Sequence, residues 1–228
     1  LVLGIDDAGR GPVIGPMVLA GCLITEEIEK EFRRLGVKDS KQLTKKRRAF
    51  LESVIKEKAE TFAIQVTHAS EIDGRNHDGI NLNDLEALMA SKIINEINIP
   101  ANTSGAKIRV ILDCPSTNKA KWRDLVISKI ENPSNLEIVC EHKADRNYVA
   151  VSAASILAKE ERERQMGKLR EEYGENMGSG YSSDPITRKF LKKNIKKLGQ
   201  KGIFRKTWKT WKRAISDFQQ KKLFLGLY

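Results

Sequence analysis

The chain has 228 residues, with 41 Lys and Arg against 30 Asp and Glu, so its net charge is +11. This positive excess favours a polyanionic partner, nucleic acid before membrane. The longest uncharged run, residues 11–25, is shorter than the ~20 apolar residues that a membrane helix needs. Charged residues also interrupt the N-terminus where a secretory signal would lie. We therefore expect a cytoplasmic protein with no membrane association, and we also expect a monomer.

The first apolar stretch, residues 1–5, predicts a buried strand that ends at Asp6 and Asp7. Burial of an ionised carboxylate is costly unless something compensates, and a bound cation would do so. The alternative is an acidic turn facing solvent. Because side chains alternate along a strand, both carboxylates reach one site only if the backbone turns at Asp7. The glycines in residues 9–11 permit such a turn.

Strand and helix patterns then alternate along the chain. Further strands are expected at residues 13–24, 62–68, 107–112 and 136–140, helices at residues 26–35, 45–59, 81–98, 118–130 and 149–173, and a polar loop at residues 69–80. Small residues at 149–158 would let that helix pack very close to a sheet. This order predicts an α/β protein with a mixed sheet covered by helices.

The composition changes near residue 185. Residues 185–216 contain twelve Lys and Arg and no acidic residue, and their apolar residues recur at helical spacing. We expect residues 1–185 to form one α/β domain and residues 186–228 a basic helical appendage. Its lysines suit phosphate contacts, whereas Trp208 and Trp211 suit packing better than base stacking. The three cysteines are expected to be buried thiols, and the histidines show no zinc-ligand spacing.

Four aspartates, Asp6, Asp7, Asp113 and Asp145, lie at or just after the ends of predicted strands. Strand ends on one edge of an α/β sheet gather side chains from distant parts of the chain. Clustered carboxylates suit Mg²⁺ or Mn²⁺, and two such ions can hydrolyse a phosphodiester. Taken singly, Asp113 is also a turn former before a proline, and Asp145 a helix cap. Together with the basic composition, they indicate a metal-dependent nuclease.

Several motifs resemble type 2 ribonuclease H, especially its archaeal members. The motifs are residues 4–16, 39–41, 142–145, 151–156 and 178–185, with similarity continuing at 208–210. The resemblance implies a ribonuclease H-like fold. It also implies a metal-dependent cut on the 5′ side of a ribonucleotide, in an RNA/DNA hybrid or in duplex DNA, that leaves 3′-hydroxyl and 5′-phosphate ends.

The resemblance also implies roles for individual residues. The four aspartates match the family's metal ligands. Gly9, Arg10 and Gly11 match the loop that reads the 2′-hydroxyl group. Tyr181 matches the tyrosine that packs on the sugar, and Lys41 matches a substrate-binding position. Two residues depart from the pattern, since the family usually has glutamate at Asp7 and proline at Ser182. The shorter Asp7 predicts weakened or Mn²⁺-shifted activity, and Ser182 a looser loop around Tyr181.

Three alternatives stay open. The first is a type 3 ribonuclease H, and the second is another nuclease of this fold, such as a junction resolvase. The third is a protein that binds RNA/DNA hybrids but has lost catalysis because of the shorter Asp7. Residues 220–228 also resemble a tail that binds a sliding clamp. The alternative for these residues is the frayed apolar end of a helix.

Overall fold

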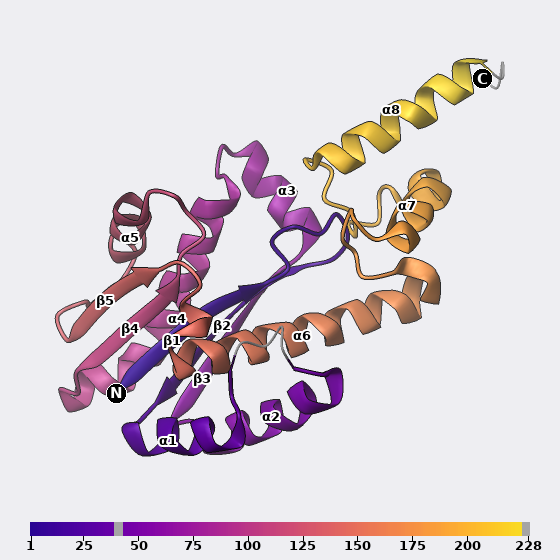
Figure 1. Ribbon diagram of the computed structural model, residues 1–228. Coiled ribbons are helices and arrows are strands. Elements are labelled where there is room, and N and C mark those ends of the chain that lie inside the picture. Colours follow the sequence, from indigo (N-terminus) through magenta and orange to yellow (C-terminus); the bar gives the residue numbers. More distant parts are fainter. Residues whose placement is uncertain (39–42, 225–228) are drawn as a thin grey trace. The chain divides into compact units, whose positions relative to one another are not determined.

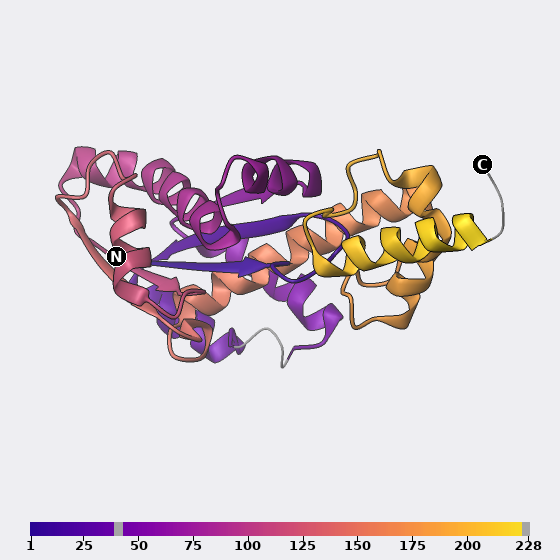
Figure 2. The same ribbon diagram turned by 90° about the horizontal axis from the view of Figure 1, so that it is seen from above.

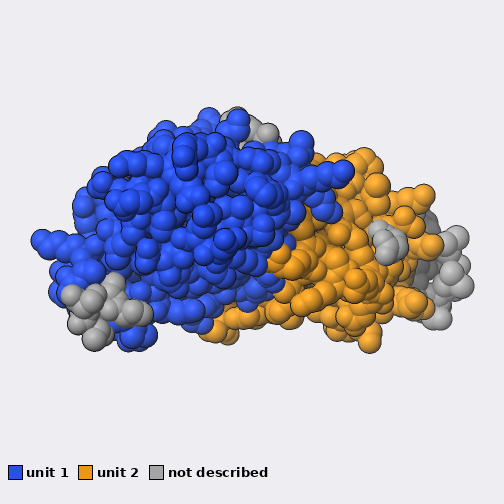
Figure 3. All heavy atoms as spheres, turned by 90° about the horizontal axis from the view of Figure 1, so that it is seen from below, with its two compact units in different colours: residues 1–8, 18–66, 81–161 blue, residues 9–17, 67–80, 162–228 orange. Residues whose placement is uncertain are grey.

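The computed structural model describes residues 1–38 and 43–224, and these form two compact units. Unit 1 contains residues 1–8, 18–66 and 81–161, and unit 2 contains residues 9–17, 67–80 and 162–228 (Figure 3). The division expected at residue 185 stays a prediction. None of the helices in the described part of the chain combines the length and hydropathy that a bilayer span requires.

A five-stranded mixed sheet forms the centre of unit 1. Its strands are β1 (Val2–Ala8), β2 (Met17–Ile24), β3 (Thr61–Thr67), β4 (Ile108–Asp113) and β5 (Leu136–Glu141). The order across the sheet is β3-β2-β1-β4-β5, with β1 antiparallel to β2 and parallel to β4, and β4 parallel to β5. The predicted mixed α/β sheet is therefore confirmed.

Helices pack on both faces of this sheet (Figures 1 and 2). Helices α1 (Glu26–Leu35), α2 (Lys45–Lys58) and the first part of α6 (Val149–Tyr173) share one core with the side chains of β1 and β2. On the other face, Gly21 of β2 approaches Ile93 of α4 (Leu82–Ser104), and α4 also packs on α5 (Lys119–Ile127). The apolar spacing of each helix sets which face it covers.

Capping residues set several of the predicted helix boundaries. The hydroxyls of Thr25 and Thr44 accept hydrogen bonds from the first turns of α1 and α2, and Gly36 ends α1 in the left-handed conformation with φ of 77°. Such caps satisfy backbone groups that have no partner within the helix. The predicted boundaries of α1 and the start of α2 are confirmed.

Unit 2 has its own apolar core. Helices α7 (Pro185–Leu198) and α8 (Lys209–Phe224) contribute to it together with the later part of α6 and residues 13–14. Trp211 is 7% exposed and its ring centroid lies 5.1 Å from that of Phe204, which fits the predicted packing role. The Asp184 carboxylate caps α7 and accepts hydrogen bonds from Ser179, and these bonds lower its pKa to about 2.

Several local predictions are wrong. The strand expected at residues 13–24 begins only at Met17, and the helix expected at residues 81–98 continues to Ser104. Residues 69–77 form helix α3 (Ala69–His77) instead of a loop, because its buried Asp73 accepts hydrogen bonds from the backbone N–H groups of Lys206 and Thr207. Such distant partners leave no local sequence pattern. Strand β1 also runs to Ala8 and stays paired with β2 through Asp6 and Asp7, so the turn that would let both carboxylates reach one site does not form at Asp7.

Helix α6 approaches β1 very closely at Gly4, as its small residues predicted. A Cβ atom at Gly4 would lie 2.1 Å from the carbonyl carbon of Ala150 and 2.2 Å from the nitrogen of Val151. Backbone atoms cannot move aside as a flexible side chain can. The contact therefore requires glycine at this position.

We predict that Gly4→Ala lowers the free energy of unfolding by roughly 3 kcal/mol, because it overpacks a rigid contact. Urea denaturation measures the change. Gly167→Ala is the matched control, since a Cβ there meets nothing within 4 Å, and it should raise stability by about 0.5–1 kcal/mol. Equal effects of the two substitutions would contradict the prediction.

Candidate active site

Asp6 and Asp113 end up beside each other because of strand register. The parallel strands β1 and β4 pair Ile5 with Leu112, and each aspartate is the next residue along its strand. Neighbouring strands lie about 4.8 Å apart. The register thus brings together two carboxylates that are distant in the sequence.

The environment of Asp6 opposes a negative charge. Its side chain is 6% exposed, and burial raises its pKa well above the ordinary value, as do the charges of Asp7 and Asp113. Hydrogen bonds from Ser155 and from the Asp7 N–H, at 2.7 Å, act in the opposite direction. A buried carboxylate with like charges beside it is stabilised in its ionised form by a cation.

Asp145 lies on a short turn next to Asp113. The N–H of Ala144 donates to the Asp113 carboxylate at 3.1 Å, and Asp145 follows directly in a 3₁₀ turn. Lys143, the residue before this turn, has φ of 58°, a conformation that non-glycine residues seldom adopt outside constrained sites. Asp145 is 3% exposed, and the Ser152 hydroxyl donates to its carbonyl oxygen at 2.6 Å. Asp6, Asp113 and Asp145 therefore belong to one acidic region of unit 1, in which Asp6 and Asp145 are buried and Asp113 is half-buried.

Asp7 is placed differently from Asp6. Regular pairing of β1 with β2 continues through Asp7 and Ala8, so successive side chains project to opposite faces of the strand. Across residues 1–38 and 43–224, no three His, Cys, Asp or Glu side chains are arranged to hold a metal ion. The carboxylate donors suit a hard divalent cation in their chemistry, but they are not drawn together around one point.

A separate group of predicted residues, Gly9, Arg10, Gly11 and Tyr181, belongs to unit 2. Gly9 has φ of 91°, which requires glycine. The guanidinium of Arg205 donates to the carbonyl oxygens of Gly9 and Arg10 at 2.6 and 2.8 Å, and the Trp208 indole donates to that of Gly11 at 3.2 Å. The loop at residues 9–11 is therefore held through its own backbone carbonyls.

Tyr181 lies near this loop within unit 2. Its side chain is 40% exposed, and a Cβ atom at Gly11 would lie 3.7 Å from its ring. The Ser182 hydroxyl, next in the chain, shares a 2.7 Å hydrogen bond with the hydroxyl of Thr210. Lys41 lies outside the described residues.

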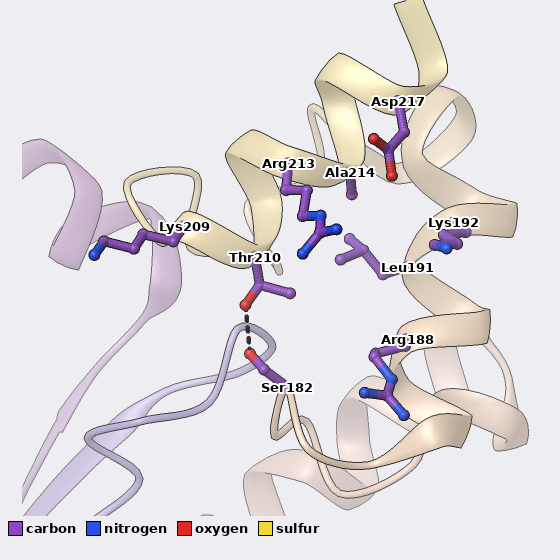
Figure 4. A pocket seen from close by; sticks show the side chains of 9 residues that line it. All are labelled: Ser182, Arg188, Leu191, Lys192, Lys209, Thr210, Arg213, Ala214 and Asp217. Carbon is purple, nitrogen blue, oxygen red and sulfur yellow. Dashed lines mark hydrogen bonds between the residues drawn. The ribbon is translucent and has the colours of Figure 1, made fainter. Parts of the chain in front are cut away.

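A basic hollow adjoins Ser182 between α7 and α8 (Figure 4). Its volume is about 380 Å³. The cationic side chains that line it are Arg188, Lys192, Lys209 and Arg213, with one carboxylate, Asp217. All four cations are exposed, so they are available to a polyanion.

Two arginines that sequence reasoning did not single out are central to unit 2. Arg205 is 0% exposed and Arg162 is 5% exposed. Arginine is almost never so buried unless its donors are engaged, but nothing in the local sequence separates these two from the many surface cations. Only the fold shows that Arg205 supports the loop at residues 9–11.

Comparison with known proteins places the chain among ribonucleases. The family model for ribonuclease HII matches residues 3–211. A ribonuclease HII from Methanocaldococcus jannaschii is 42% identical over 231 residues, covering 99% of both chains. The crystal structure of ribonuclease H2 from Pyrococcus horikoshii has a TM-score of 0.83 at 36% identity, over 96% of this chain and 98% of that one.

Two further structures extend the likeness. A complex of PCNA with ribonuclease HII from Archaeoglobus fulgidus matches with a TM-score of 0.79 at 34% identity, over 92% of this chain and 95% of that one. Bst-RNase HIII in complex with Mn²⁺ matches at 22% identity with a TM-score of 0.78, over 94% of this chain and 69% of that one, which shows a shared fold. The chain belongs to the ribonuclease HII family, and it is an endoribonuclease H.

Proposed function

We propose that this enzyme cuts on the 5′ side of a ribonucleotide, in an RNA/DNA hybrid or within duplex DNA, and leaves 3′-hydroxyl and 5′-phosphate ends. The observation that carries the proposal is the acidic region formed by Asp6 and Asp113 at the carboxyl ends of parallel strands and by Asp145 on the turn beside Asp113. A basic protein with such a region has what phosphodiester hydrolysis requires.

In this proposal Asp6, Asp113 and Asp145 would hold Mg²⁺ or Mn²⁺, two ions in all. Asp7 alternates to the other face of β1, but it lies close enough for its charge to raise the pKa of Asp6, and it would bind an ion from that side. When bound, the ions would activate water and stabilise the leaving oxygen. The burial of Asp6 beside like charges supports a cation there, because a cation offsets the repulsion that raises its pKa. The loop at residues 9–11 and Tyr181 would read the ribose, since glycine backbone approaches a 2′-hydroxyl closely.

One assay separates the proposal from its rivals. A duplex with a single embedded ribonucleotide is incubated with Mg²⁺ or Mn²⁺, and the cut is mapped. Asp113→Asn should lower the rate by about 10³-fold or more, because metal-assisted catalysis supplies several kcal/mol. Its amide oxygen still accepts from Ala144, so duplex binding should persist.

The other outcomes point elsewhere. Cutting only in longer hybrid tracts would favour type 3 ribonuclease H, and binding without product under either metal would favour a hybrid-binding protein. An Asp113→Asn variant as active as the parent would refute the acidic site.

A second prediction concerns Asp7. The side chain is one methylene shorter than the usual glutamate, a shortfall of roughly 1.5 Å for an ion held at about 2.1 Å. We predict that Asp7→Glu raises the Mg²⁺-supported rate by about 10-fold, since misplacement on this scale is costly in catalysis. Steady-state rates in Mg²⁺ and Mn²⁺ measure the effect, and an unchanged or slower Mg²⁺ rate would contradict it.

We further propose that the basic hollow of Figure 4 holds the phosphate backbone of the substrate. Arg213→Gln should reduce the slope of log affinity against log salt by about 1, the change expected for one lost phosphate contact. Binding is measured in the Asp113→Asn background. The control is Lys193→Gln, which also removes one positive charge, but from a residue of α7 that lines a different hollow. This variant should leave the slope closer to that of the parent. Equal slopes for both variants would show a net-charge effect alone.

Residues 220–228 are proposed to bind a sliding clamp. The Archaeoglobus fulgidus relative, 34% identical, is in complex with PCNA. Residues 225–228 lie outside the described part of the chain. Removal of residues 220–228 should abolish co-elution with the clamp and leave the cleavage rate unchanged, and retained co-elution would refute the assignment.

A further inference from the structure

Arg162 occupies an unusual position for an arginine. It lies on α6, its side chain is 5% exposed, and burial lowers its pKa from the ordinary value. No role for it follows from the acidic site or the basic hollow. Arginine keeps its charge even when buried, so this guanidinium is a cation inside unit 2.

The Arg162 side chain contacts both segments proposed to read the ribose. Its Nη2 donates to the Ser179 carbonyl oxygen at 3.2 Å, and its guanidinium lies 5.3 Å from the centroid of the Tyr181 ring. On the other side, a Cβ atom at Gly9 would lie 2.5 Å from Nε and 2.6 Å from Cδ of Arg162. One side chain therefore contacts both Gly9 and the Tyr181 segment.

Packing stability alone does not account for an arginine at this point. Its Nε finds no hydrogen-bond partner among the described residues, which is a cost that an apolar side chain of similar length would avoid. A guanidinium differs from such a side chain in being planar, rigid and attracted to an aromatic face. These properties fix an orientation as well as fill a space.

We propose that Arg162 is a positioning residue that fixes the orientation of the Tyr181 ring beside the loop at residues 9–11, so that both segments present a defined surface to the ribose. The proposal rests on the proposed function, in which these two segments contact the ribonucleotide. Gly11, whose added Cβ would lie 3.7 Å from the ring, shows how closely the ring and the loop approach each other. Loss of the guanidinium would let the ring turn without removing any group that touches substrate.

The test is a double-mutant cycle on the duplex with one embedded ribonucleotide. Arg162→Met should lower kcat by about 10- to 100-fold with a smaller change in KM, since it disturbs orientation more than contact. In a Tyr181→Ala background Arg162→Met should lower kcat by less than about 3-fold, because Arg162 acts on catalysis by positioning the Tyr181 ring. Arg162→Lys, which keeps the charge but not the plane, should resemble Arg162→Met.

Lys168→Met is the matched control, because it removes a charge from an exposed position on the same helix and should leave kcat unchanged. Thermal unfolding of each variant identifies any loss of fold, and Arg162→Lys serves if Arg162→Met does not fold. Equal losses from Arg162 substitution with and without Tyr181 would overturn the proposal, as would full activity of Arg162→Lys. Full activity of Tyr181→Ala would instead overturn the ribose-reading role of Tyr181, and this inference with it.

Discussion

The close contact between Gly4 and the backbone of Ala150 and Val151 determines how unit 1 presents its carboxylates. Because the first turns of α6 lie against β1, Ser155 comes within hydrogen-bonding reach of Asp6, and Ser152 bonds to the carbonyl of Asp145. Two hydroxyl groups from one helix thus support two aspartates that are far apart in the sequence. A larger residue at position 4 would move α6 and both hydroxyls together.

The acidic region also shows how a fold holds like charges together. Strand register alone places Asp6 beside Asp113, and the apolar pairs before them, such as Ile5 with Leu112, fix that register. The packing of the sheet therefore supplies the free energy that opposes the repulsion. Glu141 ends the adjacent strand in register with Asp113, but its carboxylate accepts a hydrogen bond from the Tyr148 hydroxyl at 2.7 Å. That bond distinguishes Glu141 from the aspartates.

The sequence was sufficient to predict an element where the interactions that determine it are local. Helices α1 and α2, which Thr25 and Thr44 cap, begin where the sequence pattern predicted, and strand-end aspartates indicated the acidic region. Helix α3 was missed because its support comes from the bonds between Asp73 and residues 206–207. Arg205 was missed for the same reason, since its partners lie more than 180 residues away. Interactions of this kind leave no periodic or spaced pattern in the chain.

A loop that binds its ligand through backbone groups must be held in a fixed conformation by the residues packed against it. In residues 9–11 the carbonyls of Gly9, Arg10 and Gly11 all accept hydrogen bonds from Arg205 or Trp208, so the loop cannot rotate its peptide planes freely. The Tyr181 segment has a comparable constraint at Ser182, where the hydrogen bond to Thr210 ties the loop to α8. A proline would restrict this backbone through its ring, whereas Ser182 restricts it through a tertiary contact. The rigidity of the Tyr181 segment in this chain therefore depends on α8 remaining in place.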